Sequence, residues 1–235
     1  MSMKPELDPY VEKKKVFIAT PAYDGRVWNT YAQSMIVAAQ ECYRQHIEVC
    51  SSIPSNGAFI EVMRNILVKR FLETDCTHLM WVDADLGFPP AAIAGLVHAG
   101  LRVCAGVYPQ REPETRFVVK LPNDTANVVD GWLEVERCPG GFMCIEREVL
   151  EDMSCRAPVV DLKREGHVPM IYRTEMRDGE FIGEDTNFCD DYRAMREEVV
   201  FDRAIWVWPN LDFNHAGYTG NLHDFLSREV KAKSA

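Results

Sequence analysis

Leu79-Met80-Trp81-Val82-Asp83-Ala84-Asp85 carries the clearest structural signal in this chain. Its first four residues are apolar, and such a run is typical of a short strand that is buried on both faces of a sheet. Two carboxylates follow where that strand ends, and alternation along an extended chain would place them on one face. Open α/β sheets bind ligands just beyond the carboxyl ends of their strands. Because no basic residue lies nearby in sequence, the pair predicts a cation, most simply a divalent metal that holds a phosphorylated ligand.

Strand-like and helix-like patterns alternate on both sides of this stretch. This alternation predicts right-handed βαβ units, and hence an α/β fold with a mixed, mainly parallel sheet flanked by helices. Pro89-Pro90 is typical of a helix start. In the first half we expect strands at 15–20, 47–53, 79–82 and 102–107, and helices at 28–45, 57–73 and from Pro89 to about Ala99.

The second half has a different pattern. Asp130-Gly131 predicts a hairpin turn. Residues 155–183 are rich in charge, Pro and Gly and predict a long loop, which is usually a functional lid or disordered. No repeat or linker appears, so we expect one domain over residues 1–235. Its remaining elements are expected to be strands within 128–135, at 142–145 and at 204–208, and helices at 147–153, 184–197 and from Asn221 onward.

The composition excludes several classes of protein. The 235 residues carry a net charge of −10, which argues against nonspecific binding to nucleic acid or to an anionic membrane. No apolar stretch approaches the roughly 20 residues of a membrane helix, and the polar segment Met1–Lys15 is not a secretory signal. The eight cysteines include no C-x-x-C pair, so we expect buried, reduced thiols and no zinc site. The predicted location is the cytoplasm.

Four further groups of residues lie in loops after strands or near helix starts, as ligand-binding residues often do. They are Ala19–Arg26, Arg64-Asn65, Gly140–Met143, and Gly183–Phe188 with His215-Ala216-Gly217 further on. Together with Asp83-Ala84-Asp85, and in this order, they resemble the GT-A glycosyltransferases over roughly residues 15–220. The resemblance is to compact, family 2-like enzymes such as phages, large DNA viruses and bacteria encode. It implies a Rossmann-like GT-A catalytic domain that uses a nucleotide sugar.

The resemblance also divides the domain and assigns the donor site. Residues 15–110 would bind the nucleotide sugar, residues 111–220 the acceptor, and residues 221–235 would form a tail helix. Arg64 has two open interpretations: it snorkels to the surface, or it pairs with the nucleotide or with Asp83. The loop after the first strand is also compatible with an ordinary Asp-Gly turn. The donor-binding residues implied are Thr20, Pro21, Ala22, Tyr23, Asp24, Arg64, Asp83, Ala84, Asp85, Gln110 and Gly141.

The metal ligands implied by the resemblance are Asp85, Asp83 and His215. Asp85 is the preferred ligand, whereas Asp83 more often touches ribose or a metal-bound water. A neutral imidazole suits Mn²⁺ better than Mg²⁺. Some retaining families have a basic residue after this histidine, but here Tyr218-Thr219-Gly220 follows. That departure leaves the diphosphate contact from this segment in doubt.

The acidic pair Glu184-Asp185 is the expected source of the catalytic base. The resemblance places such a pair at the start of a helix beneath the acceptor site, although acidic residues in a first helical turn also simply complement the helix dipole. An inverting transferase needs a carboxylate that takes the proton of the acceptor hydroxyl. Asp185 is the first choice and Glu184 the second.

The function predicted in this way is the metal-dependent transfer of a sugar from a UDP-sugar to a hydroxyl group of a glycan or other acceptor. UDP-glucose is the favoured donor, inversion the favoured outcome, and Mn²⁺ (or Mg²⁺) the cofactor. A haloacid-dehalogenase-like phosphatase is one alternative, but it needs Thr or Val where Gly87 stands. A sugar nucleotidyltransferase is another, but it needs a Gly-rich basic loop after the first strand. A non-catalytic sugar-binding module is a third.

Overall fold

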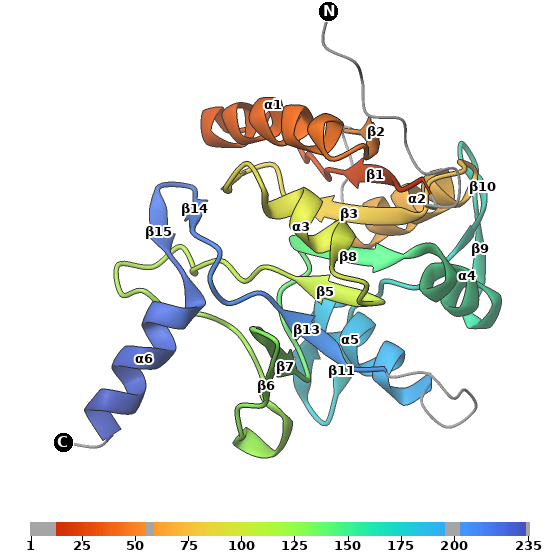
Figure 1. Ribbon diagram of the computed structural model, residues 1–235. Coiled ribbons are helices and arrows are strands. Elements are labelled where there is room, and N and C mark those ends of the chain that lie inside the picture. Colours follow the sequence, from red (N-terminus) through yellow and green to blue (C-terminus); the bar gives the residue numbers. More distant parts are fainter. Residues whose placement is uncertain (1–12, 55–58, 196–202, 234–235) are drawn as a thin grey trace, which may run out of the picture.

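The apolar run of residues 79–82 forms the buried strand that its sequence predicts. In the computed structural model, which describes residues 13–54, 59–195 and 203–233, this strand is β3 (His78–Val82) (Figure 1). It lies parallel to β1 (Lys15–Ala19), which in turn lies parallel to β2 (Glu48–Ser52). The helices α1 (Asn29–Arg44) and α2 (Ile60–Leu72) follow β1 and β2. Residues 57–58, 196–197 and 234–235 of the expected helices, and residues 1–12 of the amino-terminal segment, lie outside the described residues.

These strands belong to a mixed sheet of eight strands in the order β2-β1-β3-β8-β5-β13-β7-β6. β8 is antiparallel to both its neighbours and separates β3 from β5, while β13 lies parallel to β5 and antiparallel to β7. Only β8 and β7 therefore run against the common direction, and the predicted Rossmann-like fold with a mainly parallel, mixed sheet is confirmed. The further strands are β5 (Val103–Ala105), β6 (Val128–Val129), β7 (Trp132–Val135), β8 (Phe142–Glu146) and β13 (Ile205–Val207).

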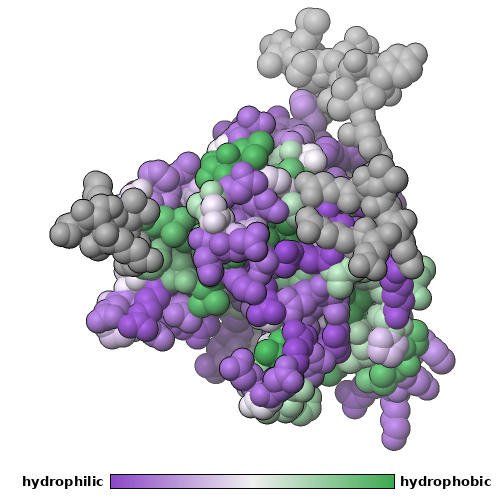
Figure 2. Space-filling view, turned by 90° about the horizontal axis from the view of Figure 1, so that it is seen from below, coloured by the Kyte–Doolittle hydropathy of each residue, from purple (hydrophilic) through white to green (hydrophobic). Residues whose placement is uncertain are grey.

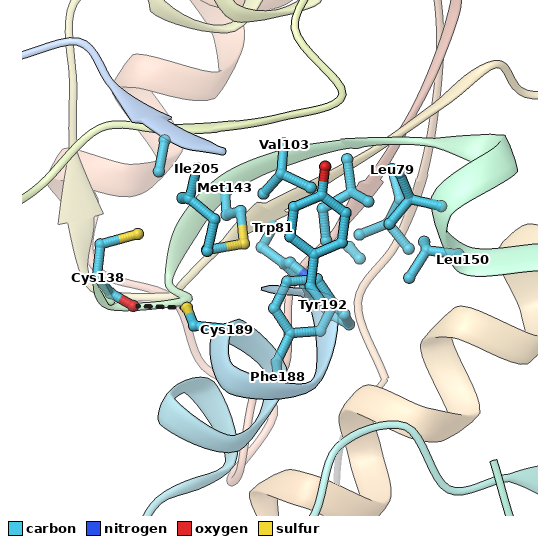
Figure 3. Close-up of a cluster of buried hydrophobic side chains, with 14 of the residues drawn as sticks. Leu79, Trp81, Val103, Cys138, Met143, Leu150, Phe188, Cys189, Tyr192 and Ile205 are labelled. Carbon is cyan, nitrogen blue, oxygen red and sulfur yellow. Dashed lines mark hydrogen bonds between the residues drawn. The ribbon is translucent and has the colours of Figure 1, made fainter. Parts of the chain in front are cut away.

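Side chains of the central strands alternate between two hydrophobic layers. Along β3, Leu79 and Trp81 enter one layer, whereas Met80 and Val82 enter the other. The first layer, drawn in Figure 3, packs beneath α2, α4 (Arg147–Arg156) and α5 (Glu184–Ala194). The second packs beneath α1 and α3 (Ala92–His98). Burial on both faces holds the carboxyl end of β3, and with it Asp83, in a fixed place.

Replacing Trp81 with alanine is expected to lower the free energy of unfolding by about 3–5 kcal/mol, because it leaves a large cavity in the first layer. The indole is fully buried, and its Nε1 donates a hydrogen bond to the Tyr172 hydroxyl at 2.8 Å. Urea unfolding measures the loss. Val159→Ala, at a side chain that is 57% exposed, is the control and should change the free energy by less than about 0.5 kcal/mol. Equal losses in the two variants would contradict the packing described.

The prediction of a long loop at residues 155–183 is wrong, because this segment forms two hairpins. β9 (Val159–Leu162) pairs with β10 (Gly166–Pro169), and β11 (Glu175–Arg177) pairs with β12 (Glu180–Ile182). Asp178 and Gly179 take positive φ angles of 53° and 86°, as a tight hairpin turn requires. The high charge of the segment obscured this turn signal. The amide of Asn65 fixes the connection between the hairpins through two hydrogen bonds to the backbone of Tyr172, at 2.7 and 2.8 Å.

A small second sheet brings the end of the chain back to the aspartate pair. β4 (Leu86–Gly87) pairs with β14 (Phe213–His215), which pairs with β15 (Tyr218–Gly220). This pairing sets His215 opposite Leu86, next to Asp85. The tail forms α6 (Leu222–Lys233), as predicted, and a short 3₁₀ turn covers Pro122–Asp124.

The surface has mixed polarity. The face in Figure 2 is mostly hydrophilic, with smaller hydrophobic patches between the polar side chains. Among the described helices, none combines the length and the hydropathy that crossing a bilayer requires.

Candidate functional site

A cleft of about 740 Å³ opens beyond the carboxyl ends of β1 and β3. It is the place at which an open α/β sheet is expected to bind a ligand. Of the residues predicted from sequence, those that line it are Pro21, Tyr23, Asp24, Arg64, Asp83, Ala84, Asp85 and Glu184. Thr20, Ala22, Gln110, Gly141, Asp185 and His215 are not among the lining residues.

Two residues of the loop after β1 support the cleft from within. The Thr20 hydroxyl is fully buried and lies 2.7 Å from the Tyr31 hydroxyl, so it faces the interior. The Ala22 N–H donates to the carbonyl of Pro54 at 3.3 Å. Asp24 accepts a hydrogen bond from the backbone of Arg26 at 3.1 Å, which is ordinary turn chemistry. The loop thus presents Tyr23 and Asp24 to the cleft, while Thr20 and Ala22 shape its backbone.

Arg64 lies at the floor of the cleft and does not reach the surface. Its side chain is 4% exposed, and its guanidinium carbon lies 4.8 Å from the centre of the Trp81 ring. Nη2 donates to Asp83 and Nε donates to Glu184, each at 3.3 Å. Burial lowers the pKa of Arg64, but the charges of Asp83 and Glu184 outweigh this effect and raise it. Nη1 is buried and has no hydrogen-bond partner among the described residues, so both of its N–H groups are unsatisfied.

Gly141 and Tyr108 hold the Asp83 carboxylate in place. The Asp83 N–H donates to the Gly141 carbonyl at 2.8 Å, and the Tyr108 hydroxyl donates to Asp83 Oδ2 at 3.4 Å. Burial, with the nearby charge of Asp83, raises the pKa of Tyr108, so this hydroxyl stays protonated. A Cβ at position 141 would overlap both the carboxylate and the Tyr108 hydroxyl. Gly141 therefore shapes the site from behind Asp83.

Gly141→Ala is expected to weaken nucleotide binding by at least about tenfold, since displacing Asp83 by about 1 Å disturbs a preorganised site. Isothermal titration with UDP in the presence of Mn²⁺ measures the effect. Gly220→Ala is the matched control, because its added Cβ would meet only side-chain carbons at 3.3 Å or more. Binding by Gly141→Ala within twofold of the wild type would show that this glycine is not needed.

Asp85 faces His215 and Arg111. Its Oδ2 lies 3.5 Å from Nε2 of His215 and contacts Nη2 of Arg111. His215 Nδ1 lies 2.7 Å from the Pro109 carbonyl, which only accepts, so Nδ1 carries the proton. Nε2 then presents its lone pair and accepts from Arg111 Nε at 2.9 Å. Burial raises the pKa of the Asp85 carboxyl, but the positive charge of Arg111 outweighs this effect and holds the pKa below its usual range.

The three predicted metal ligands do not gather into one cluster. Within the described part of the chain, no group of three or more His, Cys, Asp or Glu side chains is placed to hold a metal ion. Both carboxylates line the cleft, but they have separate partners: Asp83 binds Arg64 and Tyr108, whereas Asp85 binds Arg111 and His215. The reason is that the chain leaves its extended conformation after Val82, and Leu86 N–H donates back to the Asp83 carbonyl at 3.2 Å.

Asp85 and His215 alone still fit a divalent cation. They supply a carboxylate and a neutral imidazole whose tautomer is fixed by a backbone carbonyl, which is the usual support of a metal-binding histidine. The Arg111 guanidinium lies against both groups, and its side chain is 56% exposed, so it can be displaced. Mg²⁺ and similar ions are commonly held by one or two protein ligands together with phosphate oxygens and water.

The acidic pair begins α5, as the sequence predicts. Glu184 lines the cleft and accepts from Arg64, whereas Asp185 lies behind it and accepts from the Thr186 N–H at 2.7 Å. Burial, with the charge of Glu184, raises the pKa of Asp185. A Cβ at Gly140 would lie 3.3 Å from the Asp185 Cβ, so the glycine segment packs closely on this carboxylate. A carboxyl group with a raised pKa beside a cleft is a candidate proton acceptor.

Six further residues that are not among the predicted site residues also line the cleft: Arg26, Val27, Trp28, Asn29, Ile60 and Arg111. The Gln110 N–H is bound to the Arg116 carbonyl at 2.8 Å, and the side chain that enters the cleft from this segment is the next one, Arg111. Trp28 precedes α1, and its N–H donates to the Ala84 carbonyl at 2.8 Å. Its position directly before a helix was the available signal.

Comparison with known proteins supports the fold. No protein-family model matches the chain, and no curated protein matches it in sequence. Among solved structures, the chain is similar to A197 from STIV, with a TM-score of 0.51 and 20% identity over 86% of this chain and 85% of that one. It is more distantly similar to mannose-1-phosphate geranyltransferase from Thermus thermophilus, with a TM-score of 0.38 and 14% identity over 62% of this chain and 65% of that one.

The first similarity shows the fold alone, and the second is too distant to support any argument. The fold and the cleft together define a Rossmann-like α/β domain with a polar cleft at the carboxyl ends of its strands.

Proposed function

We propose that this chain is a metal-dependent glycosyltransferase with a GT-A-like fold. It moves a sugar from a UDP-sugar, with UDP-glucose favoured, to a hydroxyl acceptor, and it does so with inversion. One observation carries the proposal: a single cleft is lined by Asp85, the buried Arg64 and Glu184, while His215 lies against Asp85 and Asp185 adjoins Glu184 at the start of α5. A donor diphosphate, its counter-charges and a proton acceptor would meet there.

The loop after β1 and α2 supply the groups that recognise the donor. Tyr23 and Trp28 are 76% and 48% exposed at the cleft, so their rings are free to pack against a base or ribose. The carboxylate of Asp24 suits a base N–H. The unpartnered Nη1 of Arg64 suits a phosphate oxygen, because charge-assisted hydrogen bonds to phosphate are strong. Arg26 and Arg111 add positive charge to the cleft, which offsets the net charge of the chain for an anionic donor.

Asp85 and His215 are the residues that would hold the cation, Mn²⁺ or Mg²⁺. When bound, such a cation supplies charge stabilisation to the departing diphosphate. Asp85 keeps its carboxylate ionised for this purpose, and Pro109 keeps the His215 lone pair on Nε2. With a cation bound there, Arg111 would leave both groups, and its exposed guanidinium would be free to pair with a phosphate.

Asp185 is the proposed base. The acceptor oxygen forms its bond to the anomeric carbon while the bond between that carbon and the UDP oxygen breaks, and the hydroxyl proton passes to the Asp185 carboxylate. Burial and the charge of Glu184 raise the proton affinity of Asp185, which favours this role. Glu184 is the less suitable base, because its carboxylate already accepts from Arg64.

Calorimetric titration of UDP with and without Mn²⁺ tests the donor half of this proposal. We expect UDP to bind at least about tenfold more tightly with Mn²⁺, since a cation held by Asp85 and His215 would stabilise the charge of the diphosphate. GDP is the control ligand and should bind more weakly. Equal affinity for UDP in both conditions would contradict the metal-dependent site.

A further inference from the structure

Two cysteines that are 26 positions apart in sequence lie in contact. Cys50 is on β2, an edge strand of the large sheet, and Cys76 lies between α2 and β3. Their sulfur atoms are 3.0 Å apart. Both are free thiols, Cys50 exposed and Cys76 buried. The chain therefore places two reduced sulfurs side by side, with one of them open to solvent.

The backbone on both sides of this pair is held in place. Lys15 Nζ binds Glu48 at 3.2 Å and Asp75 at 2.5 Å, so one ammonium group ties together the segments that carry the two cysteines. The carbonyl of Cys76 accepts from Arg147 Nε at 2.7 Å, and Cys50 is in register with Phe17 of β1. Because the two sulfurs already lie 3.0 Å apart, we expect bond formation to need mainly an adjustment of the two side chains.

Solvent access distinguishes this pair from the other neighbouring cysteines. Cys104 and Cys144 are directly opposite each other on β5 and β8, but they are 0% and 1% exposed. A soluble oxidant cannot reach them in the folded protein. Cys155 is exposed and serves below as the unpaired reference thiol.

We propose that Cys50 and Cys76 form an oxidisable dithiol that closes to a disulfide by exchange with a small-molecule disulfide such as oxidised glutathione. The Cys50 thiolate attacks one sulfur of the oxidant, and the first glutathione leaves as a thiolate and takes up a proton. The Cys76 sulfur then attacks the Cys50 sulfur and releases the second glutathione. The two protein thiols lose two electrons and two protons, and the oxidant is reduced to two thiols.

Closing this bond would constrain the segment between the two cysteines. That segment includes α2, which carries Arg64 at the floor of the cleft. A cross-link over a loop of this size restricts the unfolded chain. We therefore expect the oxidised protein to unfold at a temperature higher by on the order of 5–10 °C. The Cys50 sulfur is partly covered, and this partial burial, with the neighbouring thiol, raises the pKa of Cys50 to about 12, so the exchange is slow and is best run at mildly alkaline pH.

The test incubates the full chain with oxidised glutathione, blocks the remaining thiols with iodoacetamide, and maps the peptides by mass spectrometry without reduction. The expected product is a peptide that joins Cys50 to Cys76, together with the rise in unfolding temperature. Cys155→Ser should keep both results, whereas Cys50→Ser and Cys76→Ser should lose both.

The unfolding temperatures of the three serine variants are also compared with that of the reduced wild type. Values within a few degrees of each other show that the substitutions themselves do not disturb folding. A glutathione adduct on Cys155 without any Cys50–Cys76 peptide would overturn the proposal, because the oxidant would then have acted without closing the pair. A linked peptide that leaves the unfolding temperature unchanged would overturn the proposed constraint.

Discussion

Replacing Asp85 with asparagine is expected to reduce Mn²⁺-dependent binding of a UDP-sugar by at least about 100-fold, a loss at the upper end of what supporting residues of metal sites show. The substitution removes the carboxylate that faces His215, and with it the negative charge that would attract a cation. Calorimetric titration in the presence and absence of Mn²⁺ measures the loss. Binding without metal should change little.

Two further variants serve as controls for the Asp85→Asn titration. Asp161→Asn alters an exposed carboxylate on the β9–β10 hairpin and should leave binding unchanged. Asp83→Asn should weaken donor binding but keep its dependence on Mn²⁺, because Asp83 is bound to Arg64 and Tyr108 and not to His215. If Asp83→Asn abolished the metal dependence and Asp85→Asn kept it, the roles assigned to the two aspartates would be reversed.

Asp185→Asn is expected to lower the rate of sugar transfer by about 10²–10⁴-fold while the affinity for the donor stays near that of the wild type. The asparagine keeps the shape of the side chain but cannot take up the acceptor proton. Transfer is measured with saturating donor, and affinity by titration. Glu184→Gln is the comparison: it should weaken donor binding more, because Glu184 contacts Arg64 in the cleft. Near-normal transfer by Asp185→Asn would show that this residue is not the base.

The raised pKa of Asp185 also predicts the sign of its effect on stability. A carboxyl group whose pKa is higher in the folded state than in the unfolded state binds its proton more tightly when folded. Stability from this group is therefore present at low pH and is lost as pH rises through the window between the two pKa values. Above that window, Asp185→Asn should unfold at the same temperature as the wild type or higher, so a loss of transfer cannot be attributed to unfolding.

The sequence predicts the centre of the fold well, because burial on both faces leaves a strong pattern. Each of β1, β3 and β8 contains a run of four apolar residues, and the alternation of strands and helices indicates the α/β class. The order of the strands in the sheet, in contrast, leaves no local pattern in the sequence. Nothing local in Phe142–Ile145 indicates that this strand lies between β3 and β5 and runs against them.

The site was predictable as a set of residues but not as a set of contacts. Asp83 and Asp85 both reach the cleft, as expected, yet a turn after Val82 sends them to different partners. The two interpretations of Arg64 were equivalent in sequence, and its burial over Trp81 decides for the cleft. The sequence gives no signal for the Cys50–Cys76 contact either, because the 26 positions that separate the two cysteines include the whole of α2.

The most direct test of the proposed glycosyltransferase activity uses a panel of UDP- and GDP-sugars with the full chain, with and without Mn²⁺. Turnover is measured as the release of the nucleoside diphosphate. The account predicts that at least one UDP-sugar, with UDP-glucose the first expected, is hydrolysed or transferred only when the metal is present. A panel in which no nucleotide sugar shows metal-dependent turnover or binding would contradict it.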